Sequence, residues 1–215
     1  MRILKSSWLQ ILVHIAALVP LAWLVWDFTQ GHLTANPIRE IQLRTGKSTL
    51  TLLVLTLACR PIYTIFGLKQ ALQLRRLLGL YTFGYASLHF LNFVGVDYEF
   101  NFALIWADIA NKRFVIVGFI TFLILLALAV TSTGEWERRL GKNWTRLHRL
   151  IYAAALLAAL HFIWQTKADF RVPFIYSGVV VLLLILRIPR IAKVVRIGGK
   201  WLKREQGGQG MVDEI

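Results

Sequence analysis

The stretch Trp144–Trp164, WTRLHRLIYAAALLAALHFIW, puts one histidine at the edge of an apolar run and another deep inside it. These residues are His148 and His161, and a third histidine, His89, lies inside a separate apolar run. An ionisable ring is costly in a membrane interior, so each intramembrane histidine is by default a candidate functional residue. These three histidines are therefore the first candidates for the functional site of the chain.

The composition indicates a membrane protein with several spans. Hydrophobic residues make up 57% of the 215 residues, against about 45–50% in a soluble domain. The mean hydropathy is +0.58, and the apolar residues come in blocks bounded by charges. The net charge of +14 is better explained by positively charged cytoplasmic loops than by nucleic-acid binding. We expect contact with membrane lipid and no nucleic-acid partner.

The single cysteine restricts the redox chemistry that the chain can carry. Cys59 stands alone, so an internal disulfide, the C-x-x-C-H pattern of covalent haem and an iron–sulfur cluster are all excluded. Any haem must therefore be the non-covalent b type. The sequence also has no glycine-rich phosphate loop or nicotinamide fingerprint, so we do not expect the chain to bind NAD(P)H itself.

Charge-free intervals predict an all-α membrane protein built as a bundle of six transmembrane helices. Each of the first four intervals holds enough residues to cross a bilayer at about 1.5 Å per residue, and the last two are shorter. The first interval is too long for the apolar core of a signal peptide, so we expect a retained helix. Residues 1–197 form the predicted membrane domain, and residues 198–215 form a basic and then disordered cytoplasmic tail. The predicted helices are 6–26, 48–68, 77–96, 114–134, 150–166 and 172–189.

The distribution of lysine and arginine predicts the orientation. The N-terminus, the second and fourth connections and the tail hold 18 of the 25 such residues. Cytoplasmic loops are enriched in these residues, so both termini should face the cytoplasm. The connections from the third predicted helix to the sixth are short, which predicts antiparallel neighbours in one bundle.

His89 and His161 are predicted to lie at matching depth on neighbouring helices. The first is 12 residues past Leu77 and the second 11 residues past Leu150, about 18 Å and 16–17 Å along helices that run in the same direction. Two such rings can each offer a nitrogen to one haem iron, and filling both axial positions suits electron transfer. The alternative for either ring is a neutral histidine hydrogen-bonded to a neighbouring helix.

His148 allows several interpretations. It precedes His161 by 13 residues, which puts it about 20 Å lower and about 140° away around an ideal helix. At the same depth the third helix offers Arg75 and Arg76, which are poor iron ligands but suitable partners for a haem propionate or a flavin phosphate. His148 therefore ligates a second haem, pairs in an unusual way or stabilises the interface. For the two arginines the alternative is ordinary positive charge on the cytoplasmic side.

The other histidines and the outer connection carry weaker signals. His14 is expected to pack or to bond between helices, and His32 to be exposed to solvent. The segment 35–47, ANPIREIQLRTGK, predicts a short amphipathic helix on the outer surface. That helix could belong to a quinone, flavin or partner site, or serve as an interfacial spacer.

Three blocks of sequence resemble the MsrQ (YedZ) family of haem-binding membrane subunits. They are NPIREIQLRTG at 36–46, RRLLGLYTFGYASLHF at 75–90 and LAVTSTGEWERRLGKNWTRLHRLIYAAALLAALHFIW at 128–164. More distantly, the chain is similar to the ferric-reductase-like transmembrane domain, a six-helix bundle that places haem between its third and fifth helices.

The resemblance implies a role for each candidate residue. His89, His148 and His161 would ligate one or two b-type haems, and FMN would be a further cofactor. The implied partner is a periplasmic, molybdopterin-containing MsrP-type subunit that repairs methionine sulfoxide in envelope proteins. Electrons would come from the quinone pool or a cytosolic flavin reductase, in a bacterial inner membrane. The chain departs from the two-haem pattern at Arg75 and Arg76, which leaves the number of haems and their pairing open.

Two rival functions remain at the level of sequence. One is a stand-alone transmembrane reductase of iron or another metal. The other is a small membrane transporter, which is disfavoured because no Asp or Glu lies inside a predicted span. The favoured function is that of an electron-transfer subunit of an oxidoreductase complex, and whether the chain catalyses a reaction by itself is uncertain.

Overall fold

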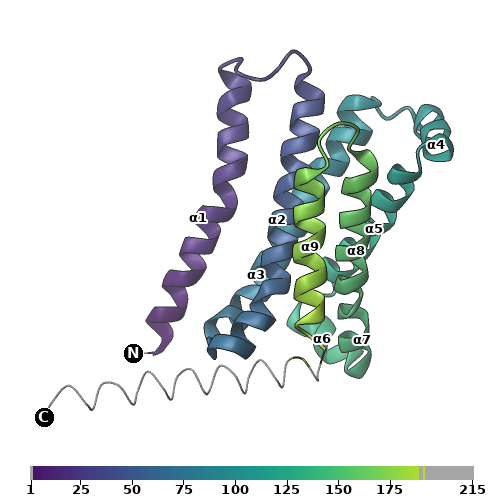
Figure 1. Cartoon of the computed structure of the whole chain (residues 1–215). Helices are drawn as coiled ribbons and strands as arrows, with labels where there is room; N and C mark the ends of the chain where they lie inside the picture. Colours follow the sequence, from purple (N-terminus) through teal and green to yellow (C-terminus); the bar gives the residue numbers. More distant parts are fainter. Residues whose placement is uncertain (1, 189–190, 192–215) are drawn as a thin grey trace, which may run out of the picture.

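The computed structural model describes residues 2–188 and 191, and within them it contains helices and no strand (Figure 1). The predicted tail, 198–215, lies outside the described residues. The elements in chain order are α1 (Arg2–Thr29), α2 (Pro37–Phe66), α3 (Lys69–Leu91), the π-helix η1 (Asn92–Asp97), α4 (Phe102–Asn111), α5 (Arg113–Val130), α6 (Gly134–Leu140), α7 (Lys142–His148), α8 (Leu150–Gln165) and α9 (Arg171–Ile185).

In the part of the chain that the structure describes, five helical segments are long and apolar enough to cross a membrane. They lie at Trp8–Thr29, Pro37–Phe66, Lys69–Asp97, Arg113–Val130 and Lys142–Gln165. A sixth apolar helix, α9, follows where the last span is predicted, but its 15 residues are fewer than the roughly 17 that a typical crossing needs. Over its described residues the chain is therefore an all-helical, multi-pass membrane protein with five candidate spans.

The helices pack mainly as antiparallel pairs. The pairs α2–α3 and α5–α8 are packed most extensively, α3 also contacts α5, and α9 packs on α8 and α2. Figure 1 shows α1 at the edge of the molecule and the small helices α6 and α7 at the end opposite α4. We call these two ends the α4 end and the α6 end. The buried core is built from small and branched apolar side chains, among them Leu53, Ala154 and Val180.

The connection between α1 and α2 does not contain the predicted surface helix. Asn36 caps α2, because its side chain accepts a hydrogen bond from the backbone N–H of Arg39 at 3.0 Å, and Pro37 occupies the first turn. From there the helix continues without a break to Phe66. The segment predicted as a separate amphipathic helix is therefore the start of α2, and the predicted start at residue 48 is wrong by about three turns.

The charges in this segment explain the error. Arg44 bonds Asp27 of α1 and Glu40 one turn earlier, both at 2.5 Å. Paired in this way, Arg44 and Glu40 are tolerated within a continuous helix. Lys47, the charge after which the predicted span starts, is exposed and also lies inside α2. The Arg44–Asp27 pair also ties α1 to α2 near the α4 end.

Two further differences concern the connections. Gly67 ends α2 in the left-handed conformation at φ 72°, which favours glycine, and α3 begins at Lys69 rather than at 77. Arg75 and Arg76 consequently lie within a helix. Past η1, the third connection contains α4, a ten-residue helix that the sequence analysis did not predict.

Candidate functional site

The structure brings together His89 and His161, the two histidines predicted to match in depth. His89 lies near the end of α3 and His161 near the end of α8, and their ring centroids are 6.2 Å apart with the planes at 86°. Both side chains are largely enclosed by the bundle, toward its α4 end. The two histidines therefore lie at the same depth in the bundle, and their imidazole rings are neighbours.

Each ring is held by a backbone carbonyl of a facing helix. His89 Nδ1 donates to the carbonyl of Gln42 in α2 at 2.9 Å, and His161 Nδ1 donates to that of Phe114 in α5 at 2.7 Å. A carbonyl only accepts, so the proton must be on Nδ1 and the lone pair on Nε2. This tautomer, fixed by a backbone acceptor, is typical of histidines that bind metal through Nε2.

Glycines give the two rings their space. A Cβ at Gly46 would lie 3.0 Å from Cε1 and 3.1 Å from Nδ1 of His89. A Cβ at Gly118 would lie 2.8 Å from the same two atoms of His161. Each ring therefore packs directly against the backbone of the helix that accepts its hydrogen bond, where an added Cβ would crowd His89 at Gly46 and overlap His161 at Gly118.

Gln42 and Asn92 add polar contacts beside His89. The Gln42 side-chain amide nitrogen lies 3.1 Å from His89 Nε2, and the Gln42 side-chain oxygen accepts from Asn92 at 2.6 Å. Thr45 lies 3.4 Å from His89 Nδ1. Coordination of a metal by Nε2 would replace the amide contact while leaving the Nδ1 bond in place.

The geometry of the pair fits a haem iron. A metal–imidazole bond is about 2 Å long, so two axial rings place their ligating nitrogens about 4 Å apart and their centroids about 6 Å apart. The observed 6.2 Å is compatible with that arrangement. Among the described residues there is no cluster of three or more His, Cys, Asp or Glu side chains that would hold a bare metal ion.

His148 lies apart from the pair, at the α6 end. It is the last residue of α7, and Arg149 separates it from the start of α8 at Leu150. Its ring stacks on Trp144 with centroids 3.9 Å apart, and Nδ1 bonds the Trp144 carbonyl at 3.1 Å. Within the described part of the chain, its Nε2 is buried and has no hydrogen-bond partner. Its lone pair is thus available to a ligand.

The two predicted arginines occupy different environments. Arg75 is half-buried and interacts electrostatically with His148, whereas Arg76 is exposed. The structure therefore brings one of them toward the histidine and leaves the other on the surface. His14 bonds Tyr81 of α3 at 2.6 Å, as an interhelical contact, and His32 is exposed, so both expectations for these residues are confirmed.

Arg187 was missed by the sequence analysis and has a specific function in packing. It follows α9 and donates to the carbonyl of Leu57 at 2.6 Å and to the hydroxyl of Tyr152 at 2.7 Å. Leu57 lies four residues before Pro61, which has no N–H to bond that carbonyl within α2. The proline was the available signal, because it leaves a carbonyl that needs another donor.

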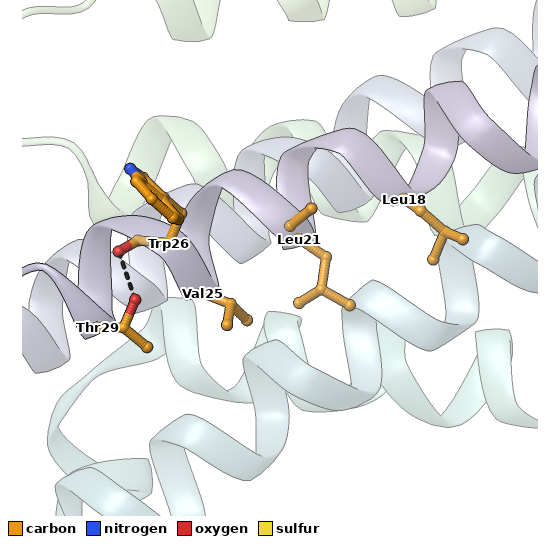
Figure 2. Close-up of a pocket in the computed structure, with 6 residues that line it drawn as sticks. Leu18, Leu21, Val25, Trp26 and Thr29 are labelled. Atoms are coloured by element: carbon orange, nitrogen blue, oxygen red, sulfur yellow. Dashed lines mark hydrogen bonds between the residues drawn. The ribbon is translucent and has the colours of Figure 1, made fainter.

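The pocket in Figure 2 is not part of this site. It runs along α1 and is lined by residues of that helix alone, including Leu18, Leu21 and Trp26. The lining is almost entirely apolar and includes none of the histidines. A hydrophobic surface on a peripheral membrane helix is expected to contact lipid.

Comparison with known proteins identifies the family. Residues 45–159 match the model of the ferric reductase like transmembrane component, a region that includes His89 and His148. A protein of Xanthomonas campestris pv. campestris (strain B100) is 44% identical over 182 residues, which cover 82% of this chain and 84% of that relative. A protein of Xanthomonas axonopodis pv. citri (strain 306) is 43% identical over 183 residues, with the same coverage. Both are named protein-methionine-sulfoxide reductase heme-binding subunit MsrQ.

The chain belongs to the MsrQ family. The matched region of the family model begins at Thr45, beside the His89 ring, and ends just before His161. It therefore contains the hairpin α2–α3 from Thr45 onward, and it excludes α1 and α9. The MsrQ relatives extend the similarity over most of the chain.

Proposed function

We propose that this chain binds a b-type haem between His89 and His161 and passes electrons through it across a membrane. The observation that carries the proposal is the facing pair of rings, 6.2 Å apart, each with Nδ1 bound to a carbonyl. The family relatives, named as heme-binding subunits, support the choice of cofactor.

The residues of the chain have defined tasks in this proposal. His89 and His161 would hold the iron through Nε2, and the carbonyls of Gln42 and Phe114 would keep the rings oriented. Haem, when bound, supplies reversible one-electron chemistry. If both histidines held the iron, it would be suited to electron transfer rather than to oxygen chemistry.

The proposal includes a second cofactor at the α6 end. The buried, unpartnered Nε2 of His148 supports a ligand there, and the nearby charge of Arg75 supports a propionate or phosphate group on it. That cofactor would be a second haem or FMN. Arg76 is exposed, and its part in this site rests on the family resemblance alone.

The chain would act as the electron-transfer subunit of a complex in a bacterial inner membrane. Electrons would enter at the cytoplasmic α6 end from the quinone pool or a cytosolic flavin reductase. They would leave at the periplasmic α4 end to a molybdopterin-containing MsrP-type subunit that repairs methionine sulfoxide. Both termini would be cytoplasmic, with α9 as a sixth span. The bias of lysine and arginine toward the connections at one end supports this orientation.

The first test is a spectrum of the purified protein in mild detergent, with a pyridine haemochrome assay. We expect a b-type spectrum from the unaltered protein. His89→Ala and His161→Ala should each lose the haem held between these two residues, and each should lose methionine sulfoxide repair. His32→Ala, at an exposed position, is the matched control and should behave like the unaltered chain. A correctly inserted, haem-free double variant that still supports repair would refute the proposal.

A further inference from the structure

The two histidines are held by the same structural unit, present twice in the chain. In each copy a carbonyl accepts the Nδ1 proton of a histidine 47 residues later, and a glycine follows that carbonyl by four residues. Every member of the second copy follows its counterpart by 72 positions. The tripeptide Leu-His-Phe also recurs at this offset, at 88–90 and 160–162.

The packing of the helices agrees with a repeat. α2 and α3 form one antiparallel hairpin, α5 and α8 form another, and α3 packs against α5. In each hairpin the first helix provides the carbonyl and the glycine, and the second provides the histidine. Parallel repeats in membrane proteins are related by an axis along the membrane normal, with their shared site between them. Here the shared feature between the hairpins is the pair of rings.

We propose that Gly46 and Gly118 are equivalent positioning residues of a single cofactor site that lies between the two repeated hairpins. This inference rests on the proposed haem. Each ring is confined between two features of the opposing helix, the carbonyl bonded to Nδ1 and the glycine packed against Nδ1 and Cε1. The glycine permits the close approach, and the carbonyl fixes the rotation of the ring.

A methyl group at either glycine acts on the iron ligand through the ring. At Gly118 the added Cβ would be 2.8 Å from both Cε1 and Nδ1 of His161, below any ordinary contact, so the ring must move or the Nδ1 bond must lengthen. At Gly46 the nearest distance is 3.0 Å, which requires a smaller displacement. The orientation of the axial rings and the Nδ1 hydrogen bond tune the electronic properties of a bound metal.

The test compares Gly46→Ala and Gly118→Ala with Gly84→Ala, a control in α3 where an added Cβ meets nothing within 4 Å. The readouts are haem per chain, the low-temperature electron paramagnetic resonance spectrum of the oxidised protein and the midpoint potential. We expect altered low-spin g values and a potential shifted in the same direction in both variants, with the larger change in Gly118→Ala. Gly84→Ala should match the unaltered chain.

Each other outcome has a defined meaning. Unchanged spectra and potentials in both variants would overturn the positioning role, and a change in only one would overturn the equivalence of the repeats. If Gly118→Ala loses its haem but keeps its helix content, the displacement of the His161 ring is large enough to prevent binding, which supports the positioning role. If that variant does not fold, Gly46→Ala, with the milder contact, decides the matter.

Failure of the proposed function is separately recognisable, because the unaltered chain would then bind no haem. Nitrogen-15 resonances of the histidine rings would report the same contact without a cofactor. The Nδ1-protonated form should be lost from His89 in Gly46→Ala and from His161 in Gly118→Ala. Retention of that form in both variants would overturn the inference.

Discussion

The contact between Arg187 and the carbonyl of Leu57 allows a quantitative prediction. Arg187→Leu removes the donor of a 2.6 Å bond to a carbonyl whose residue is 1% exposed. Leaving a buried carbonyl without a partner costs about 1–3 kcal/mol, whereas hydrogen bonds between membrane helices contribute about 0.6–2 kcal/mol. We expect a loss of about 2 kcal/mol, since the bond from Arg187 to Tyr152 is removed as well.

Pro61 supplies the internal control. In Pro61→Ala the new N–H can bond the carbonyl of Leu57 within α2, so the same arginine substitution should cost less. In a double-mutant cycle we expect a coupling of about 1 kcal/mol between the two positions. Arg138→Leu, at an exposed position on α6, should be close to neutral.

The assay is unfolding in mixed detergent micelles, followed by helical circular dichroism for the four members of the cycle and the control. The reasoning would be refuted if Arg187→Leu lowered the free energy of unfolding equally with proline and with alanine at position 61. In that case the Leu57 carbonyl would not be the group whose hydrogen bond Arg187 provides.

Three further predictions concern the attachment of α1 and the loop at the α4 end. Asp27→Asn should lower stability by about 1–2 kcal/mol in the same unfolding assay, because the Arg44 partner of this buried carboxylate is only partly exposed. Tyr85→Phe removes a 2.7 Å bond to a backbone carbonyl of α1 and should cost about 1 kcal/mol by thermal unfolding. The Lys112 ammonium holds the pKa of Asp108 below its ordinary value, so this pair should stabilise α4 at neutral pH and lose that effect below about pH 4. Tryptophan fluorescence should report this loss in the unaltered chain but not in Asp108→Asn.

The starts of α5 and α8 were predictable from the charges that bound their apolar runs. α8 runs Leu150–Gln165 against an expected 150–166, and α5 begins one residue before its expected start. The predicted starts of α2 and α3 were wrong because charged residues lie inside both helices. Arg44 is paired with Asp27 and Glu40, whereas Lys47 and Arg76 are exposed, and long basic side chains can extend away from an apolar surface without ending a helix. α4 was not predicted because its ten residues are too few for a span.

The histidine pair was predictable, but its surroundings were not. Depth depends only on the rise per residue, which is the same in every α-helix, so His89 and His161 could be matched by counting. The contacts with Gly46, Gly118 and Gln42 depend on how each helix is rotated about its axis. That rotation is set by packing between helices, which single-sequence periodicity constrains weakly in a membrane.

The division of the site between two hairpins has a consequence for the order of assembly. Each hairpin is local in sequence and can form soon after its own two helices enter the bilayer, but neither contains more than one of the facing rings. A ligand bound by both rings would join the two halves of the bundle, and its binding free energy would add to the stability of the assembled state alone. Binding of the cofactor would then require that the two hairpins are already packed together. Without the cofactor, we expect the chain to be degraded from a state in which both hairpins are inserted in the membrane but not packed against each other.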